Sequence, residues 1–69
     1  MSTAEIVAWN QGVALYQEGR SPTQFCLMPT RIVYAQVSRE AFLSRLHLGH
    51  ETWAHWVRRG YDDALACRA

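Results

Sequence analysis

Two segments near the ends of this chain each place a glycine in the middle of a helical pattern. Gly12 lies inside residues 3–18, where a glycine costs about 1 kcal/mol relative to alanine. Along residues 50–67, apolar or small residues recur at intervals of three and four: Trp53, Trp56, Val57, Gly60, Tyr61, Ala64 and Leu65. Because glycine has no side chain, it lets a neighbouring helix backbone come close. We therefore expect the first and last helices to pack against each other at Gly12 and Gly60.

The first helix is predicted over about residues 3–18. Ser2 followed by Glu5 is the pattern of a capping box, and Gly19 fits the left-handed position that ends a helix. Apolar residues at spacings of three and four predict a stripe that faces the core: Ile6, Val7, Trp9, Val13, Ala14 and Tyr16.

A second helix is predicted over residues 38–48, with Ser38 as its cap and Gly49 at its end, and the last helix follows over about residues 50–67. The intervening residues 19–37 contain two prolines and are predicted to be a linker. Within it, residues 31–36 (RIVYAQ) have the composition of a short strand. No second strand candidate exists to pair with it, so a helix or an irregular extended piece is slightly favoured.

These elements predict a mainly α fold, a small helical hairpin or helix-turn-helix-like domain that spans residues 1–69. A chain of 69 residues buries a thin core, and 49% of its residues are hydrophobic. A second copy would bury the surplus apolar surface, so a homodimer is expected.

Few residues in this chain are suited to catalysis or metal binding. Asp62 and Asp63 are adjacent, so on a helix they do not form a facing carboxylate pair. Cys26 and Cys67 form no CxxC pair and are expected to be free thiols in a reducing cytoplasm. The spacing of His47, His50 and His55 matches no common metal motif. We therefore expect a cytoplasmic protein that is not an enzyme and holds no cofactor or metal.

Composition instead favours binding to another protein. The net charge is +1, which gives no strong basic field for nucleic acid. Arginine, tryptophan and tyrosine, all present several times, are enriched at binding hot spots. The candidate partner-binding residues are Phe25, Leu27, Met28, Tyr34, Arg39 and Arg45. The four apolar residues of this set can instead be part of the core, and its two arginines can instead lie on the surface in contact with solvent alone.

Residues 38–60 resemble a helix-turn-helix of the excisionase or MerR type. The residues in register with that family are Leu46, Leu48, Thr52, Trp56 and Gly60, whereas Leu43 and His47 replace its usual alanine and glycine. The resemblance implies a DNA-binding regulator as the alternative function. The residues that would then face DNA are His50, Glu51, His55, Arg58 and Arg59.

As a whole, the chain's length, arginine-only cations and helical layout resemble the small early host-takeover proteins of Mu-like Pseudomonas phages, especially the quorum-sensing anti-activators. That resemblance implies a homodimer that inhibits host proteins by direct binding in the host cytoplasm. The implied partners are the LuxR-type activator LasR and the type IV pilus assembly ATPase. Residues 9–19 (WNQGVALYQEG) and 59–64 (RGYDDA) also resemble ribosome modulation factor, although the basic charge of that family is missing.

Overall fold

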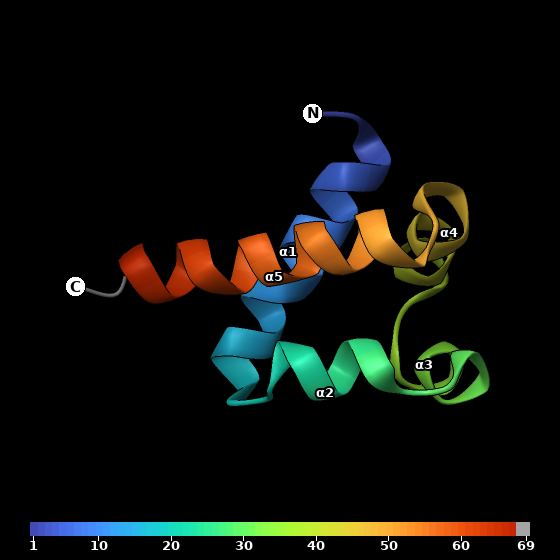
Figure 1. The fold of residues 1–69 in the computed structure, drawn as a ribbon, viewed down its shortest axis with the longest axis horizontal. Coiled ribbons are helices and arrows are strands. Elements are labelled where there is room, and N and C mark those ends of the chain that lie inside the picture. Colours follow the sequence, from blue (N-terminus) through green and yellow to red (C-terminus); the bar gives the residue numbers. More distant parts are fainter. Residues whose placement is uncertain (68–69) are drawn as a thin grey trace.

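The computed structural model describes residues 1–67, which form five helices and no strand (Figure 1). The helices are α1 (Thr3–Glu18), α2 (Pro22–Leu27), α3 (Thr30–Gln36), α4 (Arg39–Leu48) and α5 (His50–Cys67). The prediction of a mainly α fold is confirmed, and the three predicted helices lie where the sequence pattern places them.

The predicted helix ends also match the structure. The Ser2 hydroxyl accepts a hydrogen bond from the Glu5 amide at 3.3 Å, and the Ser2 amide donates to Glu5 Oε1 at 2.7 Å. These bonds to Ser2 hold the pKa of the Glu5 carboxyl below its ordinary value. Gly19 ends α1 in the left-handed conformation at φ 70°, and Ser38 caps α4.

The predicted linker over residues 19–37 is wrong, because α2 and α3 lie within it. Ser21 caps α2, with Pro22 in the first turn, where a missing amide hydrogen costs nothing. Residues 31–36 are helical, which settles the choice between strand and helix. Burial of Val33 in the core overrides the strand propensity of residues 31–36.

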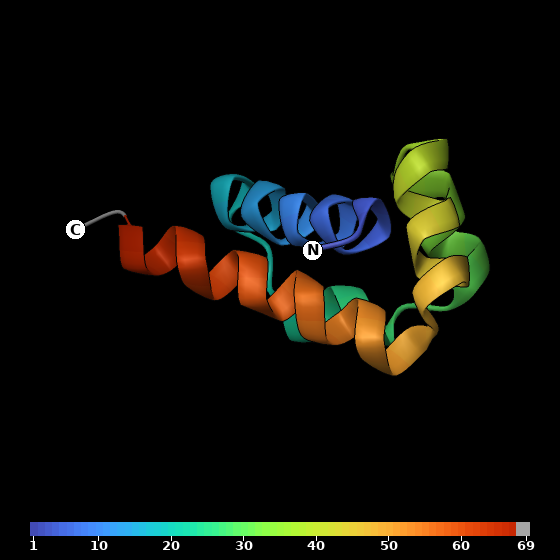
Figure 2. The same ribbon diagram turned by 90° about the horizontal axis from the view of Figure 1, so that it is seen from above.

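The packing of α1 on α5 is the most extensive between any two helices of residues 1–67. The two helices cross face to face, as Figures 1 and 2 show from perpendicular directions. A Cβ atom built on Gly12 would overlap the Val57 carbonyl oxygen and lie 2.7 Å from the Tyr61 nitrogen. A Cβ on Gly60 would overlap the Trp9 carbonyl oxygen. The expected contact at Gly12 and Gly60 is confirmed, and it joins backbone to backbone.

The buried face of α1 differs from the predicted stripe. Its centre is Ala8, Gly12 and Leu15, whereas Ile6 is 43% exposed. Apolar residues surround α1 on most sides, so spacing alone does not select the buried face. The close approach of α5 selects it, because only small residues such as Ala8 and Gly12 leave room for a second backbone.

The core lies under α5. Its buried residues are Ala8, Leu15, Phe25, Cys26, Val33, Trp53 and Val57. Helix α4 lies at one end of the α1–α5 pair, next to α3 (Figure 2). It is attached to α1 by the buried Ser44 hydroxyl, which donates to the Ala4 carbonyl oxygen at 2.6 Å.

We expect Gly60→Ala to lower the free energy of unfolding by about 3 kcal/mol or more, because the added methyl group meets backbone that cannot rotate away. Asp62→Ala, on the exposed side of the same helix, should change it by less than about 0.5 kcal/mol. Urea unfolding followed by helical circular dichroism measures both. Equal costs for the two variants would contradict the close backbone contact.

Candidate functional site

The six predicted partner-binding residues do not form one surface. Phe25 belongs to the core, 2% exposed, with its ring centroid 5.8 Å from that of Trp53, so its assignment to a binding surface is wrong. The structure supports core packing for this residue, the alternative that its apolar character left open. Met28 is half-buried and packs against the same core.

Leu27 and Tyr34 do lie on the surface. Leu27, at the end of α2, is 75% exposed, and Tyr34, in the middle of α3, is 63% exposed. The Tyr34 ring packs edge to face on the Phe42 ring of α4, with 4.8 Å between the ring centroids, and this contact fixes its position on the surface. Arg39 is exposed at the start of α4.

Arg45 is engaged within the molecule. Its guanidinium carbon lies 4.8 Å from the Trp53 ring centroid, an arrangement typical of a cation–π contact. Its Nη1 is buried and has no hydrogen-bond partner among the described residues. Arg45 therefore covers one side of the core tryptophan, a role that a polar side chain with a long apolar stem can fill.

Arg20 holds the short helices in place, a role that the sequence patterns did not predict. Its Nη2 donates to Gln36 Oε1 at the end of α3 at 2.7 Å, and its guanidinium lies 5.3 Å from the Phe25 ring centroid. It also forms an ion pair with Glu18 at 3.6 Å. One side chain thus connects the ends of α1 and α3 to the core residue of α2.

The five residues of the predicted DNA-binding face are all exposed on α5: His50, Glu51, His55, Arg58 and Arg59. Two of their cations already have partners on the protein. Arg58 donates to the Thr23 hydroxyl of α2, and Arg59 pairs with Asp63 at 3.4 Å. Glu51 and Asp62 add negative charge to the exposed side of the helix.

The junction of α4 and α5 is short. Only Gly49, at φ 82°, separates Leu48 from His50, whereas a helix-turn-helix connects its helices through three or four residues. The five residues are therefore exposed on α5, a helix whose other side packs in the core, and their connection to α4 is tighter than in the DNA-binding motif.

A groove between α1 and α4 has no counterpart among the sequence predictions. It consists of two adjoining hollows that share Thr3, Val7 and Glu40. Leu43 and Leu46 of α4 remain 49% and 60% exposed beside it. The sequence signal was present in α4, whose leucines lie on more than one side of the helix, so packing on α1 cannot bury them all.

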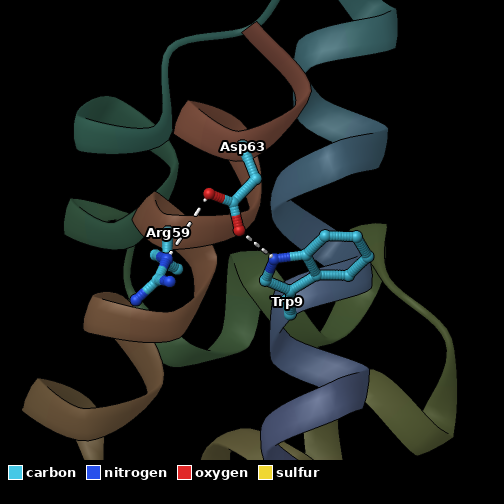
Figure 3. Close-up of polar contacts among 3 residues, drawn as sticks. All are labelled: Trp9, Arg59 and Asp63. Atoms are coloured by element: carbon cyan, nitrogen blue, oxygen red, sulfur yellow. Dashed lines mark hydrogen bonds and ion pairs between the residues drawn. The ribbon is translucent and has the colours of Figure 1, made fainter. Parts of the chain in front are cut away.

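The polar contact across the α1–α5 crossing joins three side chains (Figure 3). The Trp9 indole Nε1 donates to Asp63 Oδ2 at 2.8 Å, and Arg59 Nε donates to Asp63 Oδ1 at 3.4 Å. The adjacent aspartates therefore differ, because Asp63 accepts bonds from two helices while Asp62 is exposed to solvent.

Nucleophilic chemistry at Cys26 is disfavoured by its surroundings. Burial raises the pKa of the Cys26 thiol, and the nearby Arg58 and Arg45 offset this only in part. Cys26 and Cys67 are both free thiols. Within residues 1–67, no three His, Cys, Asp or Glu side chains are grouped so that they could hold a metal ion.

Comparison with protein-family models, curated proteins and solved structures finds no match to this chain. None of the helices in residues 1–67 is long and apolar enough to cross a membrane.

Replacement of Asp63 by alanine should cost about 1–2 kcal/mol of unfolding free energy, because it leaves the partly buried Trp9 indole N–H without an acceptor. Asp63→Asn retains an oxygen acceptor and should cost less. The neighbouring Asp62→Ala is the matched control, and thermal unfolding measures all three. A cost for Asp62→Ala as large as for Asp63→Ala would contradict the bond.

Alkylation with iodoacetamide should modify exposed Cys67 readily and buried Cys26 only when the protein unfolds.

The raised pKa of Cys26 also affects the free energy of unfolding. The ordinary pKa of a cysteine thiol is 9.0, so at pH values near and just above 9.0 the unfolded thiol loses its proton while the folded thiol keeps it. Stability should therefore fall as the pH rises through this range, and Cys26→Ala should reduce that dependence. Rapid labelling of Cys26 in the folded protein would contradict its burial.

Proposed function

We propose that this protein is a non-enzymatic inhibitor that binds another protein directly through the surface of α2 and α3. The observation that carries the proposal is the exposure of two large apolar side chains, Leu27 and Tyr34, on consecutive short helices. Arg39 at the start of α4 adds a cation of the type enriched at interfaces. We call Leu27, Tyr34 and Arg39 the partner surface.

The two apolar side chains of the partner surface have free energy to contribute on binding. Complete burial of a leucine side chain is worth about 1.5–3 kcal/mol, and at Leu27 most of this remains available to a partner. Tyr34 supplies a rigid aromatic ring, and its contact with Phe42 already orders it before binding. Side chains held in place lose little entropy on association.

The identity of the partner rests on the resemblance to the early proteins of Mu-like Pseudomonas phages. It suggests a LuxR-type quorum-sensing activator, LasR, and the type IV pilus assembly ATPase. An inhibitor of this kind acts by occupying a surface that the host protein needs, so it requires affinity and no catalytic group.

Substitution of Leu27 by glutamate or of Tyr34 by alanine should weaken binding to the purified activator or pilus ATPase by roughly tenfold or more. The control is Leu65→Glu, which changes an exposed leucine on α5, away from the partner surface. Isothermal titration calorimetry measures affinity, and circular dichroism checks the fold. Failure of the unmodified protein to bind either partner, or an equal loss with Leu65→Glu, would contradict the proposal.

A second candidate function, ribosome binding, is favoured by one observation. The two segments that resemble ribosome modulation factor, residues 9–19 and 59–64, are those that meet at the α1–α5 crossing. Gly60 lies against Trp9, and Asp63 accepts from the Trp9 indole. Two short resemblances far apart in sequence thus coincide with one structural unit.

Two measurements separate the candidates. Cosedimentation with ribosomes through a sucrose gradient would support the second function, and its absence would leave the first. Micromolar, steeply salt-dependent binding to duplex DNA would instead support the helix-turn-helix regulator and its α5 residues. A direct inhibitor of host proteins should show neither.

A further inference from the structure

Arg31 and Arg39 carry positive charge that the protein itself does not neutralise. Both side chains are exposed, and the ion pairs formed within residues 1–67 involve other arginines. Residues 19–39 contain no aspartate or glutamate. Glu40, the residue after Arg39, lines the groove between α4 and α1 instead. The two guanidinium groups are therefore free to pair with carboxylates of another molecule.

The two arginines also occupy positions that do not favour their own helices. Arg31 is the second residue of α3, and Arg39 is the first residue of α4. The backbone N–H groups of a first helical turn carry partial positive charge, so they favour an acidic side chain and disfavour a cation. Helices α1 and α5 follow this rule, with Glu5 and Glu51 in their first turns. Helix stability therefore does not explain an arginine at either position.

An apolar strip on α3 and α4, formed by Tyr34, Phe42 and Leu46, connects the two arginines. The edge-to-face contact of Tyr34 with Phe42 joins the helices, which lie side by side at one end of the molecule (Figure 2). Leu46 lies one turn beyond Phe42 on α4. Tyr34 and Leu46 are 63% and 60% exposed. Arg31 lies three residues before Tyr34, and Arg39 lies three residues before Phe42, so each arginine neighbours one ring on its helix surface.

This combination of groups suits an acidic amphipathic segment of a partner protein. The apolar side chains of such a segment can cover the apolar strip. Its carboxylates can each accept two parallel hydrogen bonds from a guanidinium group, and the exclusion of water by the adjacent apolar contact strengthens that pairing. A nucleic acid is less well matched, because two free cations neutralise few phosphates.

We infer that the apolar strip binds an acidic amphipathic segment of another protein, whose carboxylates pair with Arg31 and Arg39. The inference rests on the proposed function, because it names the chemistry of the segment that the partner surface recognises. It extends the partner surface beyond Tyr34 and Arg39 to include Arg31, Phe42 and Leu46.

Titration of the isotope-labelled full chain with defined peptides, followed by NMR of the backbone amides, tests the inference. The first probe is a synthetic helical peptide with leucines three and four residues apart and glutamate at the other positions. Two further peptides have glutamine or lysine in place of every glutamate. The glutamate peptide should shift the signals of α3 and of the exposed side of α4. The glutamine peptide should bind roughly tenfold more weakly, and the lysine peptide should not bind.

Charge variants identify the groups that recognise the carboxylates. R31Q/R39Q should weaken binding of the glutamate peptide roughly tenfold. The matched control Q17E/T52E makes the same change in net charge at exposed positions of α1 and α5, so its effect should be less than about twofold. R31E/R39E should lose the glutamate peptide and bind the lysine peptide. Glutamate is favourable in a first turn, so this variant should fold, which circular dichroism verifies.

An exchange of peptide preference between the unmodified protein and R31E/R39E would support the inference. It would be overturned if the glutamate peptide shifts no signal, or if Q17E/T52E weakens binding as much as R31Q/R39Q, even where the host activator or pilus ATPase binds. Binding of the glutamate peptide without binding of either host protein would support the inference and contradict the proposed partners. Tighter binding of an oligothymidine at the same signals would overturn it in favour of single-stranded nucleic acid.

Discussion

The contact between the backbones of α1 and α5 determines the arrangement of the whole molecule. At Gly12 and Gly60 each helix fills the space that a side chain would occupy on the other. So close an approach leaves little interior to fill, which suits a chain of 69 residues that can bury only a thin core. The remaining helices cover the sides and one end of this pair, and α4 takes its place through Ser44 and Ala4.

Those features that depend on local chemistry could be predicted from the sequence. Ser2 with Glu5, Gly19 and Ser38 bind or terminate their own backbone within a few residues, so their patterns suffice to locate the helix ends. The packing at Gly60 was also predictable, because a glycine in the middle of a regular apolar stripe indicates that a second backbone lies against it. The α5 stripe holds for Trp53, Val57 and Gly60, while Leu65 near its end is exposed.

Features that depend on distant partners could not be predicted in this way. Nothing near residues 31–36 indicates that Arg20 will bind Gln36 or that Val33 will enter the core. Their composition suited a short strand, and only the lack of a second strand to pair with it slightly favoured a helix or an irregular piece. Phe25 could not be separated from its exposed neighbour Leu27 within a continuous apolar run. The α1–α4 groove escaped prediction for the same reason, since it depends on which face of α4 the α1 helix covers.

The short helices α2 and α3 form an edge of the molecule whose shape depends on contacts with the core. With six and seven residues, they are too short to persist as isolated helices, so they depend on Phe25, Val33 and Arg20 for their shape. Any shift of α2 or α3 against the α1–α5 pair therefore moves Phe25 or Val33 within the core. If the exposed Leu27 and Tyr34 bind another protein, as we propose, they present to it a surface whose shape the core has already set.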